Sequence, residues 1–566
     1  MPTLEEDRDT GAGPAESERV AGAPAWRRRW RAGRGSLLAL LRRHWLFAVA
    51  PALGVVPRAI VMAAYAPAAL FKLDTYDYLW GATHLTPNPV NPAGYSAFLW
   101  LLRPFHSLLL IATLQHLMGL GIAVMIYAIL RYWGVSAWLA TLATTPVLFD
   151  PAQLLLEQLI MADILAMFLM IASFTVLLTR RSPSGWRSAT ALLLMGASTV
   201  VRPDALPIIF LMAGYLLVRR SGWRRAGAAL AAGLLPVAGY VAWFAAASGT
   251  IGLTRSDGLF LWSRTMSFAN CATIKPPPSL KALCPGRQPI SREQPTLDGR
   301  FLPREYLWDH RAWQWQPPSP GLVPDTAAFT PAKNARARHF AILAIEAQPL
   351  AYARVVGAGV LKAFTTSDTL HFPGTQPPPI DLSVANRHYM LAAVRGYLGT
   401  TAGIAPYLGV ALGIHVEQPY ADMVVRYQDR IHLPGPVLGL IVAIGLAGIL
   451  IPRTRSAAAA LAWAAAVLIA ILPVAEHEFA YRYVIPAVPL ACLAAALGAR
   501  NLGRARPGAA AGTHSGADSA VPQPSAPQPT VPQPTVPQPT VPQPTVPQPR
   551  APQPTVPQPR GEVTPA

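Results

Sequence analysis

The sequence predicts an all-α polytopic membrane protein with about ten transmembrane helices. Of its 566 residues, 52% are hydrophobic and only 13% are charged, and the mean hydropathy is +0.31. A soluble domain carries about 25% charged residues. The apolar residues are gathered into blocks near the length of about 20 residues that a helix needs to cross a bilayer. We therefore expect membrane-crossing helices, a long extracytoplasmic region and disordered termini.

Arginine clusters between the apolar blocks predict the orientation of the chain. They include WRRRWRAGRG (26–35), RRSGWRR (219–225) and RNLGRAR (500–506). Basic residues concentrate on the cytoplasmic side of membrane proteins, so both termini are expected in the cytoplasm. The net charge of +19 is divided among these short clusters and forms no basic stripe with an aromatic platform, so we expect no nucleic-acid partner. We expect no cleavable signal peptide, because the polar and basic segment 1–44 before the first predicted span is too long for the start of one.

The ten predicted spans alternate between the two sides. Residues 351–415 are ambiguous, because two apolar stretches there suit either an interfacial helix or an extra crossing. The predicted spans are 45–66, 107–130, 135–149, 156–178, 188–201, 205–218, 226–247, 435–451, 457–475 and 484–498.

The composition divides the chain into six segments. The C-terminal VPQPT repeats favour extended polyproline II structure, which suits a spacer better than a ligand for a proline-binding domain. The predicted segments are a disordered acidic N-terminus (1–24), a basic juxtamembrane helix (25–44), a transmembrane module (45–247) with its first outside loop at 67–105, an extracytoplasmic region (248–434), C-terminal transmembrane helices (435–498) and a disordered proline-rich cytoplasmic tail (499–566).

Two of the three cysteines, Cys271 and Cys284, fall in the extracytoplasmic region. Disulfides persist on that side of the membrane, so we predict a bridge between them, with two unpaired thiols as the alternative. Cys492 lies in the last predicted span, where we expect it to pack as a small apolar residue.

Charged side chains gather where the predicted spans meet the outer surface. Charges at membrane depth cost several kcal/mol and so need a structural or functional reason. Taken singly, each has a plain structural explanation, such as a buried salt bridge between Arg202 and Asp204. Together they predict one charged site on the outer face. Its residues are Arg58, Lys72, Asp74, Asp77, Glu157, Asp163, Arg202, Asp204, Glu476, His477, Glu478 and Arg482.

This combination of charges suits group transfer from a lipid phosphate. An aspartate can accept the proton of an acceptor hydroxyl as general base. Arginine and lysine stabilise the charge on a departing phosphate. The paired carboxylates Asp74 and Asp77 also suit a divalent cation, Mg or Mn, as a candidate cofactor. The sequence has no zinc-like ligand spacing and no glycine-rich phosphate loop, so a cytosolic nucleotide donor is not expected.

Three stretches resemble the GT-C superfamily of membrane glycosyltransferases. They are Arg58 followed by LDTYDYLWGATHL (73–85) and NPAGYSAFLWLL (91–102), the acidic segment with Asp163, and AYRYVIPAVPL (480–490). The resemblance is to the branch that uses polyprenyl-phosphate-linked sugars, including protein O-mannosyltransferase-like and aminoarabinose-transferase-like proteins.

The resemblance implies an outward-facing enzyme in which Asp74 matches the catalytic base and Tyr78 matches a following tyrosine. Many relatives carry an acidic residue directly after that aspartate, where this chain has Thr75. Asp77 is then a possible substitute, which leaves any metal requirement open.

The sequence therefore predicts an inverting glycosyltransferase of the cell membrane, with its active site on the extracytoplasmic face. The donor is a polyprenyl-phosphate sugar among membrane lipids, and the acceptor hydroxyl belongs to a glycan, a protein or a lipid. The alternatives are a transporter or flippase for a lipid-linked or anionic solute, and a scaffold that recruits partners through its tail. In the predicted site Asp74 is the base, Asp77 and Asp163 position the acceptor or a cation, Arg58, Lys72, Arg202 and Arg482 hold the donor phosphate, and Tyr78, Glu157, His477 and Glu478 complete the pocket.

Overall fold

The structure is a computed structural model. It describes residues 44–287, 303–308, 329–365, 407, 415–451 and 456–502. The predicted acidic N-terminus, most of the basic juxtamembrane helix and the proline-rich tail lie outside these ranges. The described residues form helices and one antiparallel two-stranded sheet, in which β1 (Tyr65–Ala66) pairs with β2 (His415–Val416). The predicted all-α polytopic class is confirmed.

Five helical runs are long and apolar enough to cross a membrane. They are α2 (Trp45–Ala64), α5 (Leu108–Tyr132), α12 (Trp223–Ser248), α23 (Ala457–Glu476), and the run Tyr481–Arg500 formed by α24 (Tyr481–Val484) and α25 (Val488–Leu502). Two bent pairs raise the number to seven if each is one span. They are α17 (Pro331–Ala347) with α18 (Pro349–Thr365), bent by 101°, and α21 (Tyr420–Arg430) with α22 (Gly435–Leu450), bent by 55°. A multi-pass membrane protein is supported, but ten spans are not confirmed.

Backbone breaks divide two of the ten predicted spans. The predicted span 135–149 is divided into α6 (Ala137–Leu142) and α7 (Thr145–Phe149), with Pro146 at the start of α7. The predicted span 156–178 is divided into α8 (Pro151–Gln158) and α9 (Ala162–Leu178). Between α8 and α9 the backbone is extended and Leu159 forms an isolated bridge with Ala69. A hydropathy pattern does not register such breaks, because the residues at them remain apolar.

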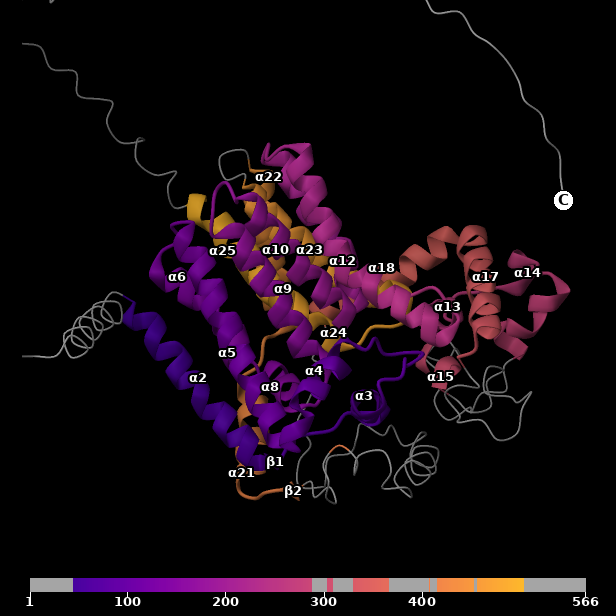
Figure 1. The fold of residues 1–566 in the computed structure, drawn as a ribbon, viewed down its shortest axis with the longest axis horizontal. Helices are drawn as coiled ribbons and strands as arrows, with labels where there is room; N and C mark the ends of the chain where they lie inside the picture. Colours follow the sequence, from indigo (N-terminus) through magenta and orange to yellow (C-terminus); the bar gives the residue numbers. More distant parts are fainter. Residues whose placement is uncertain are drawn as a thin grey trace, which may run out of the picture. The chain divides into compact units, whose positions relative to one another are not determined.

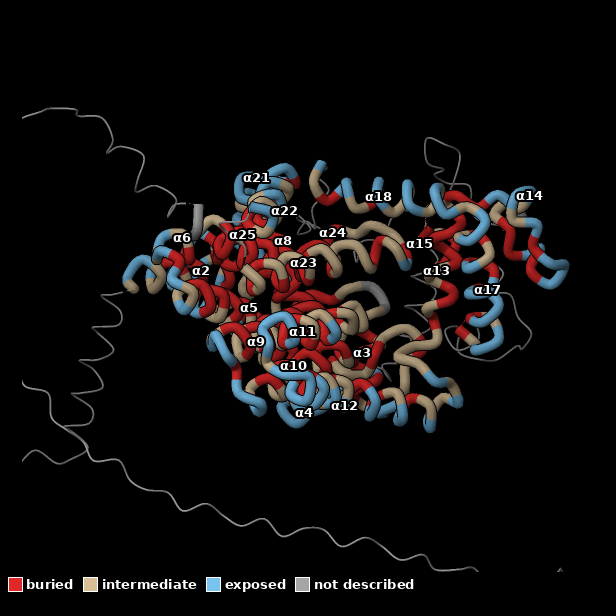
Figure 2. The backbone as a smooth tube through the Cα atoms, turned by 90° about the horizontal axis from the view of Figure 1, so that it is seen from above, coloured by how far each residue is buried: buried red, intermediate tan, exposed pale blue. Residues whose placement is uncertain are grey.

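Glycines allow the membrane helices to approach closely. The helix α10 (Gly185–Val201) packs against α9 and α12 (Figure 1). A Cβ at Gly196 of α10 would lie 2.0 Å from the carbonyl oxygen of Gly233 in α12. Small residues at helix crossings bring backbones together in membranes, where packing drives association. Figure 2 shows how far each helix is buried in the protein. The helices α8 and α25 are largely buried, whereas α12 and α21 have long exposed stretches.

Three further α-helices belong to the first part of the chain. They are α3 (Lys72–His84), α4 (Gly94–Leu102) and α11 (Leu206–Val218).

A second apolar cluster lies in the predicted extracytoplasmic region. It is built from α13 (Asp257–Thr265), α14 (Cys271–Ile274), α15 (Pro303–Trp308) and α17, around the fully buried Trp262. The ambiguous stretch 351–415 begins with α18, and apart from Tyr407 its residues after Thr365 lie outside the described ranges.

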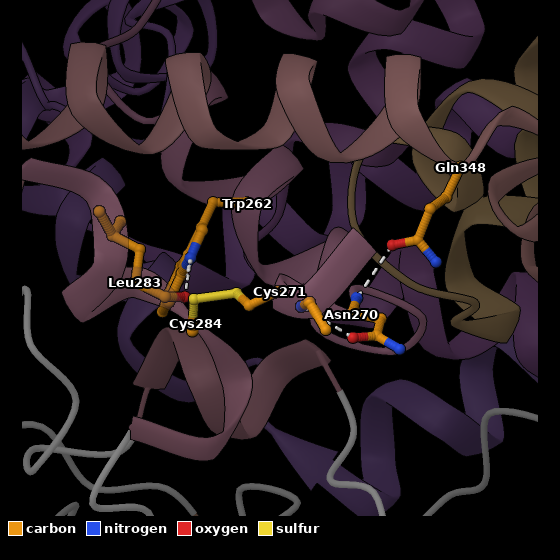
Figure 3. The surroundings of a disulfide bond; sticks show 7 residues. Trp262, Asn270, Cys271, Leu283, Cys284 and Gln348 are labelled. Carbon is orange, nitrogen blue, oxygen red and sulfur yellow. Dashed lines mark hydrogen bonds between the residues drawn. A yellow bond between two sulfur atoms is a disulfide. The ribbon is translucent and has the colours of Figure 1, made fainter. Parts of the chain in front are cut away.

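A disulfide joins Cys271 and Cys284 beside this cluster, the pairing that the sequence predicts (Figure 3). Their Cα atoms are 6.1 Å apart, and the Trp262 indole donates a hydrogen bond to the Leu283 carbonyl at 3.1 Å. Cys492 is buried and unpaired in α25. The bridge therefore closes the loop that covers one side of Trp262.

We expect Gly196→Ala to destabilise the protein by about 1–3 kcal/mol, because the added methyl group forces α10 and α12 apart. Thermal unfolding of the purified protein in detergent measures the effect. The matched control is Gly239→Ala in α12, where a Cβ meets nothing within 4 Å. Equal melting temperatures for the two variants would contradict this view of the crossing.

We expect the denatured, unreduced protein to react with one maleimide per chain, at Cys492, and the reduced protein to react with three. Mass spectrometry of the labelled chain counts the adducts. Replacing both Cys271 and Cys284 by serine removes a constraint worth about 3 kcal/mol for a loop of this length. Three labelled thiols before reduction would exclude the bridge.

Candidate active site

The loop after α2 leads into α3, which carries Asp74 in its first turn. Thr75, the next residue, is fully buried. Its hydroxyl donates to the Ile160 carbonyl at 3.1 Å and accepts from the Phe71 amide at 2.8 Å. Thr75 therefore fastens the start of α3 to the extended segment between α8 and α9. The Thr75 side chain makes this attachment at the position where many GT-C relatives carry an acidic residue.

Asp74 pairs with Arg482, which comes from α24 at the other end of the chain. A guanidinium nitrogen of Arg482 lies 3.1 Å from Asp74 Oδ2. The same guanidinium stacks on the Phe71 ring at 4.6 Å and on the Tyr483 ring at 4.9 Å. The two side chains stay 16% and 25% exposed, so the pair remains accessible.

A second set of charges surrounds Arg202, which ends α10. Arg202 forms ion pairs with Asp163 in the first turn of α9 and with Asp204, the latter at 2.9 Å. Its guanidinium also lies over the Tyr483 ring, 5.4 Å from the ring centre. The Tyr483 ring thus contacts both Arg202 and Arg482, and it links the two ion-paired groups.

Tyr78 on α3 is influenced by the charges of both ion-paired groups. Burial raises the pKa of Tyr78 well above its usual value, and Asp74 and Asp163 raise it further, while Arg202 and Arg482 oppose them. The phenol stays protonated and its hydroxyl donates to Asn91 Oδ1 at 3.4 Å. All four charged residues therefore act on Tyr78. The structure brings Asp74, Asp163, Arg202, Arg482 and Tyr78 together from α3, α9, the end of α10 and α24.

One oxygen in this group is left with free acceptor capacity. Asp163 is 1% exposed and gives its Oδ1 to Arg202, whereas its Oδ2 has no hydrogen-bond partner in the described part of the protein. Buried carboxylate oxygens are normally hydrogen-bonded, so an orphaned one is a site for an incoming donor such as a hydroxyl.

The contacts described for Asp77 and Lys72 do not connect them to the two arginines of the site. Asp77 accepts a hydrogen bond from Asn91 Nδ2 at 3.2 Å. Lys72 begins α3, but its side chain lies outside the described residues. Across the described ranges, no group of three or more His, Cys, Asp or Glu side chains is arranged to hold a metal ion. A cation at Asp74 and Asp77 stays a prediction.

Arg58 and Glu157 lie in a different network, buried among α2, α5 and α8. They form an ion pair at 2.8 Å, and Arg58 also donates to the carbonyl oxygens of Gly54, Val147 and Leu148. Glu157 further binds His116 Nδ1 and accepts from Gln153. None of the hydrogen bonds described for Arg58 goes to the Asp74 group. Sequence reasoning missed His116, whose place in the middle of a predicted span was the available signal.

His477 and Glu478 lie where α23 meets the second apolar cluster. His477 is buried against the Phe260 ring at 4.9 Å and contacts Ser263 Oγ at 3.0 Å. Burial lowers the pKa of His477 to about 4, so the imidazole is neutral at neutral pH. Glu478 accepts from the Arg304 amide at 3.3 Å. The contacts described for these two residues therefore join the second cluster to the membrane helices, rather than reaching Asp74.

Tyr483 is the residue of the site that sequence reasoning passed over. It stands beside Arg482 in the AYRYVIP motif, which was the signal that could have found it. The fold and the site define a multi-pass membrane protein with a cluster of paired carboxylates and guanidinium groups at the ends of its helices.

Comparison with known proteins relates this membrane protein to a family of glycosyltransferases. A family model for dolichyl-phosphate-mannose-protein mannosyltransferases matches residues 102–200, from the end of α4 to the end of α10. This is a GT-C family, so the resemblance of the sequence to that superfamily is confirmed over the matched segment. The match supports a membrane glycosyltransferase of the mannosyltransferase type. Asp163 and Glu157 lie inside the segment, whereas Asp74 and Arg482 lie outside it. No curated protein and no solved structure matches this chain.

We expect Glu157→Gln to destabilise the protein by about 3–5 kcal/mol, because it leaves the buried Arg58 without its counter-charge. The matched control is Glu478→Gln, whose ion pair with Arg304 is 3.7 Å long and half exposed on the arginine side. Such a pair contributes about 1 kcal/mol or less. Thermal unfolding of the two variants in detergent measures the difference, and equal losses would refute the structural role assigned to Glu157.

Proposed function

We propose that this protein transfers a sugar from a polyprenyl-phosphate carrier to an acceptor hydroxyl, with Asp74 as the general base. The observation that carries the proposal is the pairing of Asp74 with Arg482 and of Asp163 with Arg202, with the Tyr483 ring in contact with both guanidinium groups. A phosphate needs cations and an acceptor hydroxyl needs a base, and this site offers both within one group of side chains.

The donor phosphate competes with Asp74 for Arg482. When the donor binds, its phosphodiester, which carries one negative charge, takes the place of the carboxylate on Arg482, and Asp74 is released from its ion pair. The phosphate gains its second negative charge as the bond to the sugar breaks. Guanidinium groups bind phosphate oxygens with two parallel hydrogen bonds and stabilise the charge that builds up on the leaving group. Arg202, whose guanidinium lies 5.4 Å from the centre of the same Tyr483 ring, supplies a second cation.

The released Asp74 carboxylate accepts the proton of the acceptor hydroxyl as its oxygen attacks the anomeric carbon. The new carbon–oxygen bond forms while the bond from that carbon to the phosphate oxygen breaks, and the electron pair leaves on the polyprenyl phosphate. Attack opposite the leaving group inverts the configuration at the anomeric carbon. Holding both substrates in line supplies much of the rate by itself.

Asp163 positions the acceptor, since its Oδ2 is buried and has no described partner. Asp77 supports the acceptor from the same face through its contact with Asn91. A divalent cation at Asp74 and Asp77 would only help to bind the substrates, and no step of the proposed sugar transfer depends on it.

The matched family supports the proposed classes of donor and acceptor. Its name specifies a dolichyl-phosphate-mannose donor and a protein acceptor. We therefore propose a polyprenyl-phosphate hexose, mannose first, and a hydroxyl group of a protein as the pair to test. The arginine clusters support an extracytoplasmic site, because the positive-inside rule assigns them to the cytoplasmic side.

We expect Asp74→Asn to lower the transfer rate about 10²- to 10⁴-fold, the contribution of a positioned general base. The assay follows labelled mannose from polyprenyl-phosphate-mannose to membrane protein, using the purified chain in vesicles. Asp77→Asn is the matched control on the same helix and is expected to keep more of the activity, because Asp77 is not the base.

An Asp74→Asn variant that melts like the wild type and transfers sugar at the wild-type rate would refute the base assignment. Loss in both aspartate variants to the same extent would assign them one joint role, such as holding a cation.

A further inference from the structure

Two loops on the side of the bundle away from Asp74 carry nearly the same sequence. They are RRSPSGWR (180–187), between α9 and α10, and RRSGWRR (219–225), between α11 and α12. Each joins two successive helices, and each carries a tryptophan in the first turn of the second helix: Trp186 in α10 and Trp223 in α12. The loops contain seven arginines and no aspartate or glutamate.

Hydrogen bonds hold the two loops side by side. Arg219 donates to the Arg181 carbonyl at 3.1 Å, and Arg225 donates to the Pro183 carbonyl at 3.3 Å. The Arg181 amide is bonded in turn to the Tyr132 hydroxyl at the end of α5. The loops therefore form one surface, which we call the paired-arginine surface (180–187 and 219–225).

Most of the arginines on this surface are exposed. Six of its arginines are exposed and one, Arg187, is half-buried. No ion pair described for this protein includes any of the seven. Like charges crowded in this way repel one another, so the surface is favourable only where anions gather near it.

Two exposed tryptophans mark the depth of this surface in the membrane. Trp186 is 67% exposed and Trp223 is 74% exposed. Arg187 lies 5.6 Å from the Trp186 ring centre, and Arg224 lies 5.4 Å from that of Trp223. Tryptophan is enriched at the level of the lipid headgroups, where an apolar ring and a polar edge are both satisfied. The arginines beside these rings are therefore at phosphate height.

We propose that the paired-arginine surface binds the headgroups of anionic phospholipids. Its arginines form hydrogen bonds with the lipid phosphates, while Trp186 and Trp223 pack beside the adjoining glycerol and upper acyl chains. Basic residues between transmembrane helices bind anionic headgroups in this manner, and each contributes about 1 kcal/mol near the surface. The surface lies at the opposite ends of α9–α12 from Asp163 and Arg202, so this lipid site is distinct from the proposed transfer site.

The test uses the purified full chain in discs of phosphatidylcholine, titrated with fluorescent phosphatidylglycerol. The variant R180Q/R220Q keeps Arg181, Arg219 and Arg225, which take part in the bonds between the loops. We expect its affinity for the probe to fall about fivefold for each charge removed. R180K/R220K keeps the charges and is expected to bind like the wild type.

The matched control R426Q/R430Q removes two exposed arginines from α21 and is expected to leave the affinity unchanged. Wild-type binding by R180Q/R220Q, or equal binding of a phosphatidylcholine probe, overturns the proposal. The proposal is also overturned if the probe binds only after residues 1–24 are deleted. The six acidic residues of that segment would then be the natural occupant of the paired-arginine surface.

Discussion

The buried ion pair between Arg58 and Glu157 is the constraint on which the rest of the site depends. Glu157 lies one residue before the end of α8 at Gln158, and a short extended segment then leads into α9. Gln115 holds this segment through hydrogen bonds to the Glu157 and Leu159 carbonyls at 2.9 and 2.7 Å. A half-satisfied buried charge is far more costly than a complete network, so these partners hold the segment in one position.

That segment supports both candidate catalytic carboxylates. On one side it runs alongside Ala69, which exchanges backbone hydrogen bonds with Gln158 and Ile160. It also accepts the Thr75 hydroxyl, which locates Asp74 one residue away. On the other side it leads directly into α9 and Asp163. Both carboxylates lie in the first turn of a helix, where the helix dipole favours negative charge.

The two arginines of the site reach these carboxylates from different parts of the chain. Arg202 arrives from the end of α10, and Arg482 arrives from α24, more than four hundred positions after Asp74. In the described structure each carboxylate is neutralised by an arginine. In the reaction that we propose, the donor phosphate exchanges with a carboxylate already bound to arginine, and this exchange couples donor binding to release of Asp74.

The sequence by itself determined the membrane class, because apolar blocks and arginine clusters are properties of composition and order. It also marked Asp74, Asp163, Arg202 and Arg482, since charges at membrane depth are too costly to be incidental. Only the tertiary structure separated Arg58 and Glu157 from that group, added Tyr483 and His116, and divided predicted spans at α7 and between α8 and α9. The physical reason is that hydropathy and local motifs report what a residue is, whereas ion pairs, ring contacts and backbone breaks depend on which distant segments meet.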